Sequence, residues 1–294
     1  MIIDFRIRPP LGSFKQLSIY TNRWLKGLFD FHGGTPGSVQ ERSMTMLRAE
    51  MQRADVVKAV VWGRAVDDPK ESTSNDDVAA IVEENRDVFA AGLGGICVRG
   101  SSQEAIAASV AEVDRAIGVL KLRGVTLEPM FGIKPVGHAN EERFYPIYER
   151  CQQLGGILGL TICRGSGDEQ DLGHSDPVHV DRVARAFPKL RIVVSHAFWP
   201  WTHESCGLAF RRDNVYLLPD MYGVGMPGHM AWVELVNTVA PEKVLFGSAY
   251  PIVGINELAA GYLSLPYKND EVRKMVMYDN AARLLGLDSQ TFSS

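Results

Sequence analysis

The sequence predicts one α/β domain, a single (β/α)8 barrel of the TIM type over residues 1–294, and three observations support this fold class. Eight short β-branched, apolar runs alternate with longer amphipathic segments. The runs are too apolar for strands with one exposed face, which is typical of a parallel sheet buried on both sides. No linker, repeat or low-complexity segment divides the chain. A doubly wound sheet is the alternative.

The elements follow one another at a regular spacing. Strands are predicted at 2–7, 57–62, 88–96, 123–127, 157–162, 190–195, 214–218 and 243–246. Apolar residues at helical spacing predict crossover helices at 39–54, 75–85, 103–120, 141–154 and 176–187, and an extra C-terminal helix outside the barrel at 270–285. Because eight β/α units close naturally into a ring, the barrel is the preferred prediction.

The first connection is unusually long. Residues 8–37 interrupt the rhythm with Pro9-Pro10, Gly33-Gly34 and Pro36. In a barrel, ligand chemistry lies at the carboxyl ends of the strands, where the loop after the first strand begins. We therefore expect this loop to cover the barrel mouth as a lid or pocket wall.

Composition excludes several classes of function. The chain has 46% hydrophobic and 22% charged residues and a net charge of −4, with no run of Lys or Arg, so neither nucleic acid nor a membrane surface is an expected partner. Its four cysteines form no C-x-x-C pair, which favours a reducing compartment. Because the sequence shows neither a signal-peptide pattern nor a membrane-length apolar run, we expect a cytoplasmic protein.

Five stretches, weak singly but specific in this order, together resemble the amidohydrolase-related (amidohydrolase 2) family of metal-dependent hydrolases and decarboxylases. They are MIID at 1–4, RFYPIY at 143–148, FPKLRIVVSH at 187–196, VLFGSAYP at 244–251 and NAARLLGL at 280–287. The resemblance covers nearly the whole chain and implies a (β/α)8 barrel, in agreement with the strand count.

The family's metal ligands are mostly replaced. Its first strand normally ends in Asp-x-His-x-His, but this chain has Arg6 and Arg8 in place of the two histidines. The histidine expected after strand five is Cys163, and the strand-eight aspartate is Ala249. His196 matches the strand-six histidine and is the ligand that remains.

These replacements argue against a metal and for an anion. A catalytic zinc site needs about three protein ligands, and guanidinium groups repel a divalent cation. The two-residue period of a strand places Asp4, Arg6 and Arg8 on one face. We therefore predict no metal or other cofactor, with Arg6 and Arg8 anchoring a carboxylate, phosphate or enolate oxygen. The alternative is structural, with Arg6 in an ion pair to Asp4 or to a neighbouring strand.

Other residues at strand ends are candidates for chemistry and substrate contact. His196 is the predicted general acid or base, assisted by Glu128 after strand four and Asp220 after strand seven. Either carboxylate could instead pair with the arginines. Cys163 and Tyr250 are predicted substrate contacts: Tyr250 belongs to an aromatic wall, and Cys163 is either a partner of His196 or a small buried residue.

Three functions remain open. The first is a metal-independent hydrolase, with the metal-free pyrone-dicarboxylate lactonases as the precedent that the resemblance supplies, or a decarboxylase of a small carboxylated substrate. The second is an inactive barrel that binds an anionic metabolite, which Ala249 favours because the lactonases keep an aspartate base there. The third retains zinc through Cys163, His196 and a nearby carboxylate. Barrels of this family are often dimers or larger, so a homo-oligomer fits all three.

Overall fold

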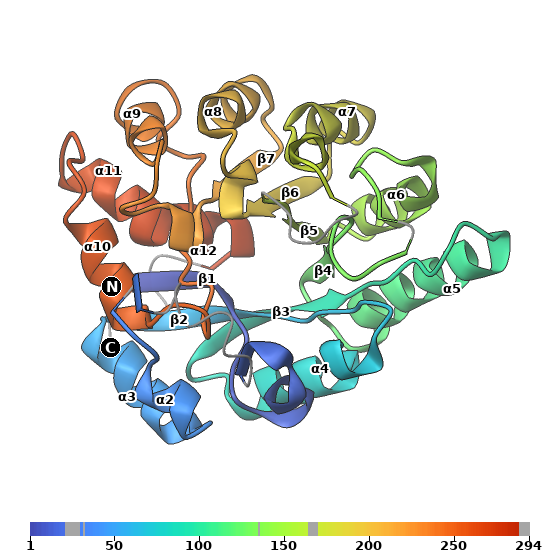
Figure 1. Cartoon of the computed structure of the whole chain (residues 1–294), viewed down its shortest axis with the longest axis horizontal. Helices are drawn as coiled ribbons and strands as arrows, with labels where there is room; N and C mark the ends of the chain where they lie inside the picture. Colours follow the sequence, from blue (N-terminus) through green and yellow to red (C-terminus); the bar gives the residue numbers. More distant parts are fainter. Residues whose placement is uncertain (21–29, 32, 135, 164–169, 288–294) are drawn as a thin grey trace.

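The computed structural model describes residues 1–20, 30–31, 33–134, 136–163 and 170–287. Seven parallel strands lie side by side in chain order from β1 to β7 and form a curled sheet with helices along its outer side (Figure 1). The strands are β1 (Ile2–Ile7), β2 (Val56–Trp62), β3 (Phe89–Gly95), β4 (Gly124–Leu127), β5 (Ile157–Thr161), β6 (Arg191–Ser195) and β7 (Val215–Leu218). A doubly wound sheet would reverse the strand order at one point, so that alternative is wrong.

The predicted eighth strand at 243–246 does not form as a strand. The segment still lies between β7 and β1, because Val244 forms a bridge to Leu217 and Tyr250 forms one to Ile7. Its ladder is interrupted where the Phe246 N–H donates to the Val276 carbonyl, in the C-terminal helical run, at 3.0 Å. Elsewhere the segment keeps backbone hydrogen bonds to both neighbours, since Leu245 N–H donates to the Leu217 carbonyl at 2.9 Å and Phe5 N–H donates to the Phe246 carbonyl at 3.0 Å.

Helices cover the outer face of the sheet. They are α2 (Gly37–Gln40), α3 (Met44–Arg53), α4 (Asn75–Glu84), α5 (Gln103–Asp114), α6 (Tyr145–Gln153), α7 (Val178–Ala186), α8 (Thr202–Arg211), α9 (Met230–Thr238), α10 (Ile255–Leu263), α11 (Asp270–Lys274) and α12 (Asn280–Leu285). Short 3-10 turns are η1 (Gly12–Gln16), η2 (Ser18–Tyr20), η4 (Pro69–Glu71), η6 (Glu142–Phe144), η7 (Leu172–Ser175), η8 (His196–Phe198) and η9 (Asp220–Tyr222), and η5 (Arg115–Val119) and η10 (Met275–Asp279) are π-helical.

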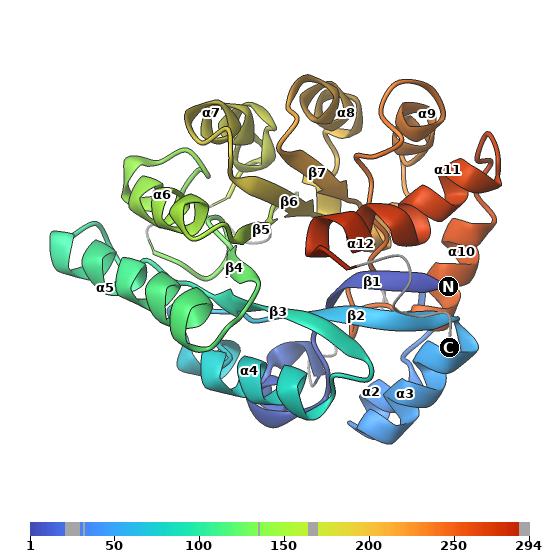
Figure 2. The same ribbon diagram turned by 180° about the vertical axis from the view of Figure 1, so that it is seen from behind.

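The predicted helix at 39–54 is divided into α2 and α3. Arg42 has a φ of 46°, which a helix cannot contain, and the Ser43 side chain then caps α3 by accepting from the Met46 N–H. At the other end of the chain, α11, η10 and α12 form one helical run from Asp270 to Leu285, as predicted. This run packs against the inner residues Ile3 and Phe5 and lies across one end of the strands (Figure 2).

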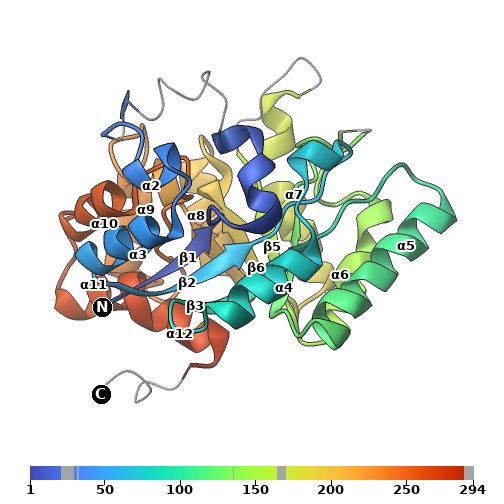
Figure 3. The same cartoon turned by 90° about the horizontal axis from the view of Figure 1, so that it is seen from below.

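The start of the first loop packs at the opposite end of the strands. Phe14 and Leu17, from η1 and the residue after it, are completely buried. The dark-blue turns lie beyond the tips of β1 and β2, whereas α12 lies at the opposite end of the strands (Figure 3). Residues 12–20 thus form a wall above the barrel mouth. The other part of the predicted lid, 21–29 and 32, lies outside the described residues. Among the described residues, no helix is long and apolar enough to cross a bilayer.

Candidate functional site

The charged residues predicted from the strand ends gather in one buried cluster at the barrel mouth. Arg6 lies in β1 and Arg8 just after it, and Glu128, His196 and Asp220 each follow directly, or within two residues, the ends of β4, β6 and β7. All five are buried. Because the carboxyl ends of parallel strands meet at one edge, the topology itself brings these side chains together.

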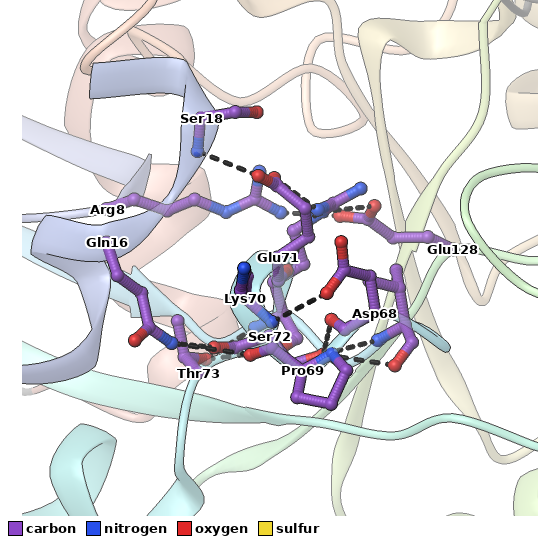
Figure 4. Close-up of polar contacts among 12 residues, drawn as sticks. Arg8, Gln16, Ser18, Asp68, Pro69, Lys70, Glu71, Ser72, Thr73 and Glu128 are labelled. Carbon is purple, nitrogen blue, oxygen red and sulfur yellow. Dashed lines mark hydrogen bonds and ion pairs between the residues drawn. The ribbon is translucent and has the colours of Figure 1, made fainter. Parts of the chain in front are cut away.

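Arg8 is held by a carboxylate that it shares with a second arginine. Its Nη2 lies 2.5 Å from Glu128 Oε1, and Arg64 Nε donates to Glu128 Oε2 at 2.9 Å. Arg64 Nη1 also donates to the backbone carbonyl of Glu71 at 2.8 Å and to Glu71 Oε2 at 3.1 Å. The other carboxylate oxygen of Glu71, Oε1, accepts from the Ser18 N–H at 2.9 Å. Figure 4 shows Glu71 between Ser18, on the first loop, and the pair formed by Arg8 and Glu128.

The ionisation of Glu128 follows from these partners. Burial alone would raise its pKa, but the guanidiniums of Arg64 and Arg8 outweigh burial and lower the pKa of Glu128 to about 2. A carboxylate that stays ionised at neutral pH is a poor proton carrier. The structure therefore favours the ion-pair alternative for Glu128 over a role in acid–base chemistry.

Arg6 has a different environment. Its Nη1 lies 3.6 Å from Asp220 Oδ2, longer than a hydrogen bond, and its guanidinium lies 5.6 Å from the centre of a Trp62 ring. Within the described part of the chain, the buried Nε of Arg6 has no hydrogen-bond partner. The side chain pairs with Asp220, which follows β7, and not with Asp4. Of the structural alternatives for Arg6, the structure therefore shows an ion pair to a carboxylate from another strand end and not a pair to Asp4. A buried guanidinium with unmet donors is costly unless a ligand fills them.

Asp220 is the most heavily bonded carboxylate of the cluster. Its Oδ2 accepts from Ser195 Oγ at 2.8 Å and from the His196 N–H at 3.2 Å, and its Oδ1 lies 2.7 Å from His196 Nδ1 and also accepts from the Met221 N–H. These partners fix Asp220 as the group that orients His196, rather than as an independent acid or base.

His196 is positioned to exchange a proton through its other nitrogen. Because Nδ1 faces Asp220, Nε2 is the nitrogen available to a substrate or water, and the ring meets Tyr222 edge to face at 5.4 Å. Burial lowers the pKa of His196, although Asp220 opposes this. A lowered pKa favours the neutral imidazole, which is the form that a general base requires.

Asp4 lies beside the segment that carries Ala249. Its Oδ1 accepts from the Ser248 N–H at 2.9 Å and from the Arg6 backbone N–H at 3.1 Å. Asp4 is completely buried, and burial raises its pKa to about 6. The carboxylate thus ties the strand-eight segment to β1, one residue before the position where the family has its aspartate.

The two remaining predicted contact residues, Tyr250 and Cys163, are buried. The Tyr250 hydroxyl donates to Ser38 Oγ at 2.9 Å, so it connects the end of the first loop to the strand-eight segment. Cys163 is buried two residues after the end of β5 and directly before residues 164–169, which lie outside the described residues.

The donor set does not fit the divalent metal that the family resemblance implies. At the two positions of the lost first-strand histidines stand guanidiniums, and the nitrogen Nδ1 of His196 is already held by Asp220. In the described ranges, no group of three or more His, Cys, Asp and Glu side chains could hold a metal ion.

Sequence reasoning missed Arg64 and Ser195. Arg64 is a charged residue two positions after β2, which is the same signal that identified Glu128 and Asp220, so the rule could have found it. Ser195, the last residue of β6, gave no signal because its role depends on Asp220 reaching it from β7.

Comparisons with known proteins agree with this architecture. The family model described as amidohydrolase matches residues 3–287. An uncharacterised TIM-barrel protein from Bordetella bronchiseptica is 34% identical over 97% of this chain and 98% of its own, with a TM-score of 0.87. Among curated proteins, the search found no significant match.

Two more distant structures share the fold. The 5-carboxyvanillate decarboxylase of Sphingomonas paucimobilis is 20% identical over 98% of both chains, with a TM-score of 0.66. The 4-oxalomesaconate hydratase of Rhodopseudomonas palustris is 16% identical over 98% of this chain and 96% of its own, with a TM-score of 0.67. With the family model matching almost the whole length, the chain belongs to the amidohydrolase-related family.

Proposed function

We propose that this protein is a metal-independent hydrolase of a small carboxylated ester or lactone. The observation that carries the proposal is Arg6, a buried cation whose Nε–H has no partner among the described residues, close to a histidine that Asp220 orients. A fixed donor beside a general base is the pair of groups that ester hydrolysis requires. The replaced ligand positions support a reaction without a metal.

The chemistry can be assigned to this chain's own atoms. His196 Nε2 takes a proton from a water molecule, whose oxygen attacks the ester carbonyl carbon. The carbonyl oxygen then becomes an oxyanion, to which Arg6 donates. When the intermediate collapses, the bond to the leaving oxygen breaks, and His196 returns its proton to that oxygen. Arg8, which keeps an unmet buried Nε–H, would bind the substrate's carboxylate.

Charge development favours hydrolysis over decarboxylation. In hydrolysis, negative charge grows on the oxygen that faces an arginine, so the arginine stabilises the transition state more than the ground state. In decarboxylation, the carboxylate loses its charge as carbon dioxide leaves, and an arginine bound to it would stabilise the ground state. Decarboxylation is the second candidate because a fold neighbour of known activity is a decarboxylase.

The test is turnover by enzyme of known metal content. Chelator-treated protein, with zinc, manganese and iron measured per chain, is assayed against five- and six-membered lactones and acyclic esters that carry a carboxylate. We expect hydrolysis of at least one lactone that chelation does not reduce, and a drop of about 10²-fold or more in kcat for His196→Gln. Turnover that requires added metal would support the Cys163 and His196 zinc site instead. Binding without turnover of any member would support the inactive, anion-binding barrel.

A further inference from the structure

Glu128 creates an electrostatic difficulty for Arg8. A single carboxylate at 2.5 Å neutralises a single guanidinium, and a neutral pair attracts a substrate anion weakly. Both side chains are buried, so solvent screens this pairing very little. For Arg8 to bind a carboxylate, part of the charge of Glu128 must be balanced by another group.

Arg64 is the group that balances part of the charge of Glu128. It takes the second oxygen of Glu128 through Nε, so the carboxylate is divided between two arginines. Its backbone is fixed as well, because its N–H donates to Thr73 Oγ1 at 2.8 Å and its carbonyl accepts from the Thr73 N–H at 2.7 Å. The Arg64 backbone also packs closely against Gly95. Only a glycine leaves room for it there, since a Cβ at position 95 would lie 2.5 Å from the Arg64 carbonyl carbon.

The far side of Arg64 is held by Glu71. Arg64 Nη1 contacts the Glu71 side chain at 3.1 Å, and the other oxygen of that carboxylate accepts from the Ser18 N–H (Figure 4). Glu71 is more exposed than Glu128, with 24% of its side chain accessible against 4%, so water screens its charge more. The buried group of Arg8, Glu128 and Arg64 therefore carries a net positive charge toward the mouth.

We propose that Arg64 is a positioning residue that holds Glu128 by one oxygen and so keeps Arg8 able to bind the carboxylate of the substrate. The proposal rests on the proposed function for its ligand, a small carboxylate. It assigns Glu128 the role of setting the charge at Arg8.

The test is a charge-compensation series, with malonate as the probe. Isothermal titration at constant ionic strength compares the wild type with Arg64→Gln, Arg64→Lys, Glu128→Gln and the double variant Arg64→Gln/Glu128→Gln. Arg115→Gln is the matched control, because Arg115 also bridges two carboxylates, Glu112 and Asp76, but lies at the end of α5.

We expect Arg64→Gln to weaken malonate binding by about tenfold, because Glu128 then closes on Arg8, and Arg64→Lys to weaken it less. Glu128→Gln should bind malonate more tightly than the wild type, and the double variant should return to within about threefold of it. Arg115→Gln should match the wild type. A residue that only supports the fold would show no such recovery.

Two results overturn the proposal and are distinguishable from each other. Wild-type protein that binds no malonate contradicts the anion anchor and therefore the proposed function too. Wild-type binding together with unchanged affinity in Arg64→Gln, or with weaker binding in Glu128→Gln, contradicts only the role of Arg64. If Arg64→Gln does not fold, Arg64→Lys and the Glu128→Gln single variant decide the question by the same signs.

Discussion

Arg6 lies in β1 and Arg8 directly after it, and both are buried, yet their surroundings differ. Arg8 lies in a chain of short ion pairs that continues through Glu128 to Arg64, whereas the ion pair of Arg6 to Asp220 is 3.6 Å long. Among the described residues, the buried Nε of each arginine has no hydrogen-bond partner. The difference shows that burial and residue type do not identify a ligand-binding arginine. The ion pairs of the terminal nitrogens do, because a guanidinium already held in a short ion pair has fewer donors left for a ligand.

The largest expected loss of stability follows from removing Asp220, the carboxylate that pairs with Arg6. Asp220→Ala removes the acceptor for Ser195, His196 and the Met221 N–H and leaves Arg6 unpaired, so we expect a loss of about 4 kcal/mol in the free energy of unfolding. Urea denaturation at pH 7 measures it. A loss below about 1 kcal/mol would show that water replaces Asp220 and that Asp220 does not hold Arg6 and His196 in place.

The next largest expected effect is the difference in stability between a variant of Arg8 and the same variant of Arg6. Arg8→Met breaks a buried pair and should lower the free energy of unfolding by about 3 kcal/mol, whereas Arg6→Met removes a costly cation and should change it by less than about 1 kcal/mol. The same denaturation series compares them. Equal losses for both variants would remove the distinction on which the comparison depends.

Low pH should weaken the ion pair between Arg8 and Glu128. The pKa of Glu128 is lowered from 4.5 to about 2, so its contribution is complete above pH 4.5 and is lost as the pH falls toward 2. The loss should amount to about 3 kcal/mol, and the difference between wild type and Glu128→Gln should vanish over the same range. Denaturation at pH 7, 5, 4 and 3 tests this. A difference at pH 3 that is as large as the difference at pH 7 would be the contrary result.

The smallest effect has the opposite sign and concerns Asp4. Because burial raises its pKa from 3.8 to about 6, Asp4 favours folding most below pH 3.8 and progressively less as the pH rises through 6. Asp4→Asn keeps the acceptor for the Ser248 N–H without the charge, so we expect a gain of about 1–2 kcal/mol at pH 8 and none at pH 4. A loss at pH 8 would mean that the charge of Asp4 is needed there.

Much of this arrangement was predictable from sequence. The period of apolar runs identified β1 over its full length and β5 within one residue, and the rule that parallel strands share a carboxyl edge gathered Arg6, Arg8, Glu128, His196 and Asp220. The eighth predicted strand does not form as a regular strand, because the Phe246 N–H donates to the Val276 carbonyl of the C-terminal helical run instead of to a neighbouring strand.

The different ion-pair partners of Arg6 and Arg8 could not be predicted from the sequence. It depends on Arg64, which reaches Glu128 from a different strand, and on Glu71, which holds Arg64 beneath the first loop. Sequence spacing places residues on faces of strands, but it does not state which nitrogen meets which oxygen. Which ion pairs form is decided by how the side chains pack at the barrel mouth.

One binding measurement tests the central claim that Arg6 is the open cation of a metal-free site. Chelator-treated wild type and Arg6→Met, with metal content measured in both, are titrated with malonate, and denaturation confirms that both are equally stable. We predict that the wild type binds without metal and that Arg6→Met binds at least about tenfold more weakly. Equal affinity in the two proteins, or binding that appears only when zinc is added, would contradict the account.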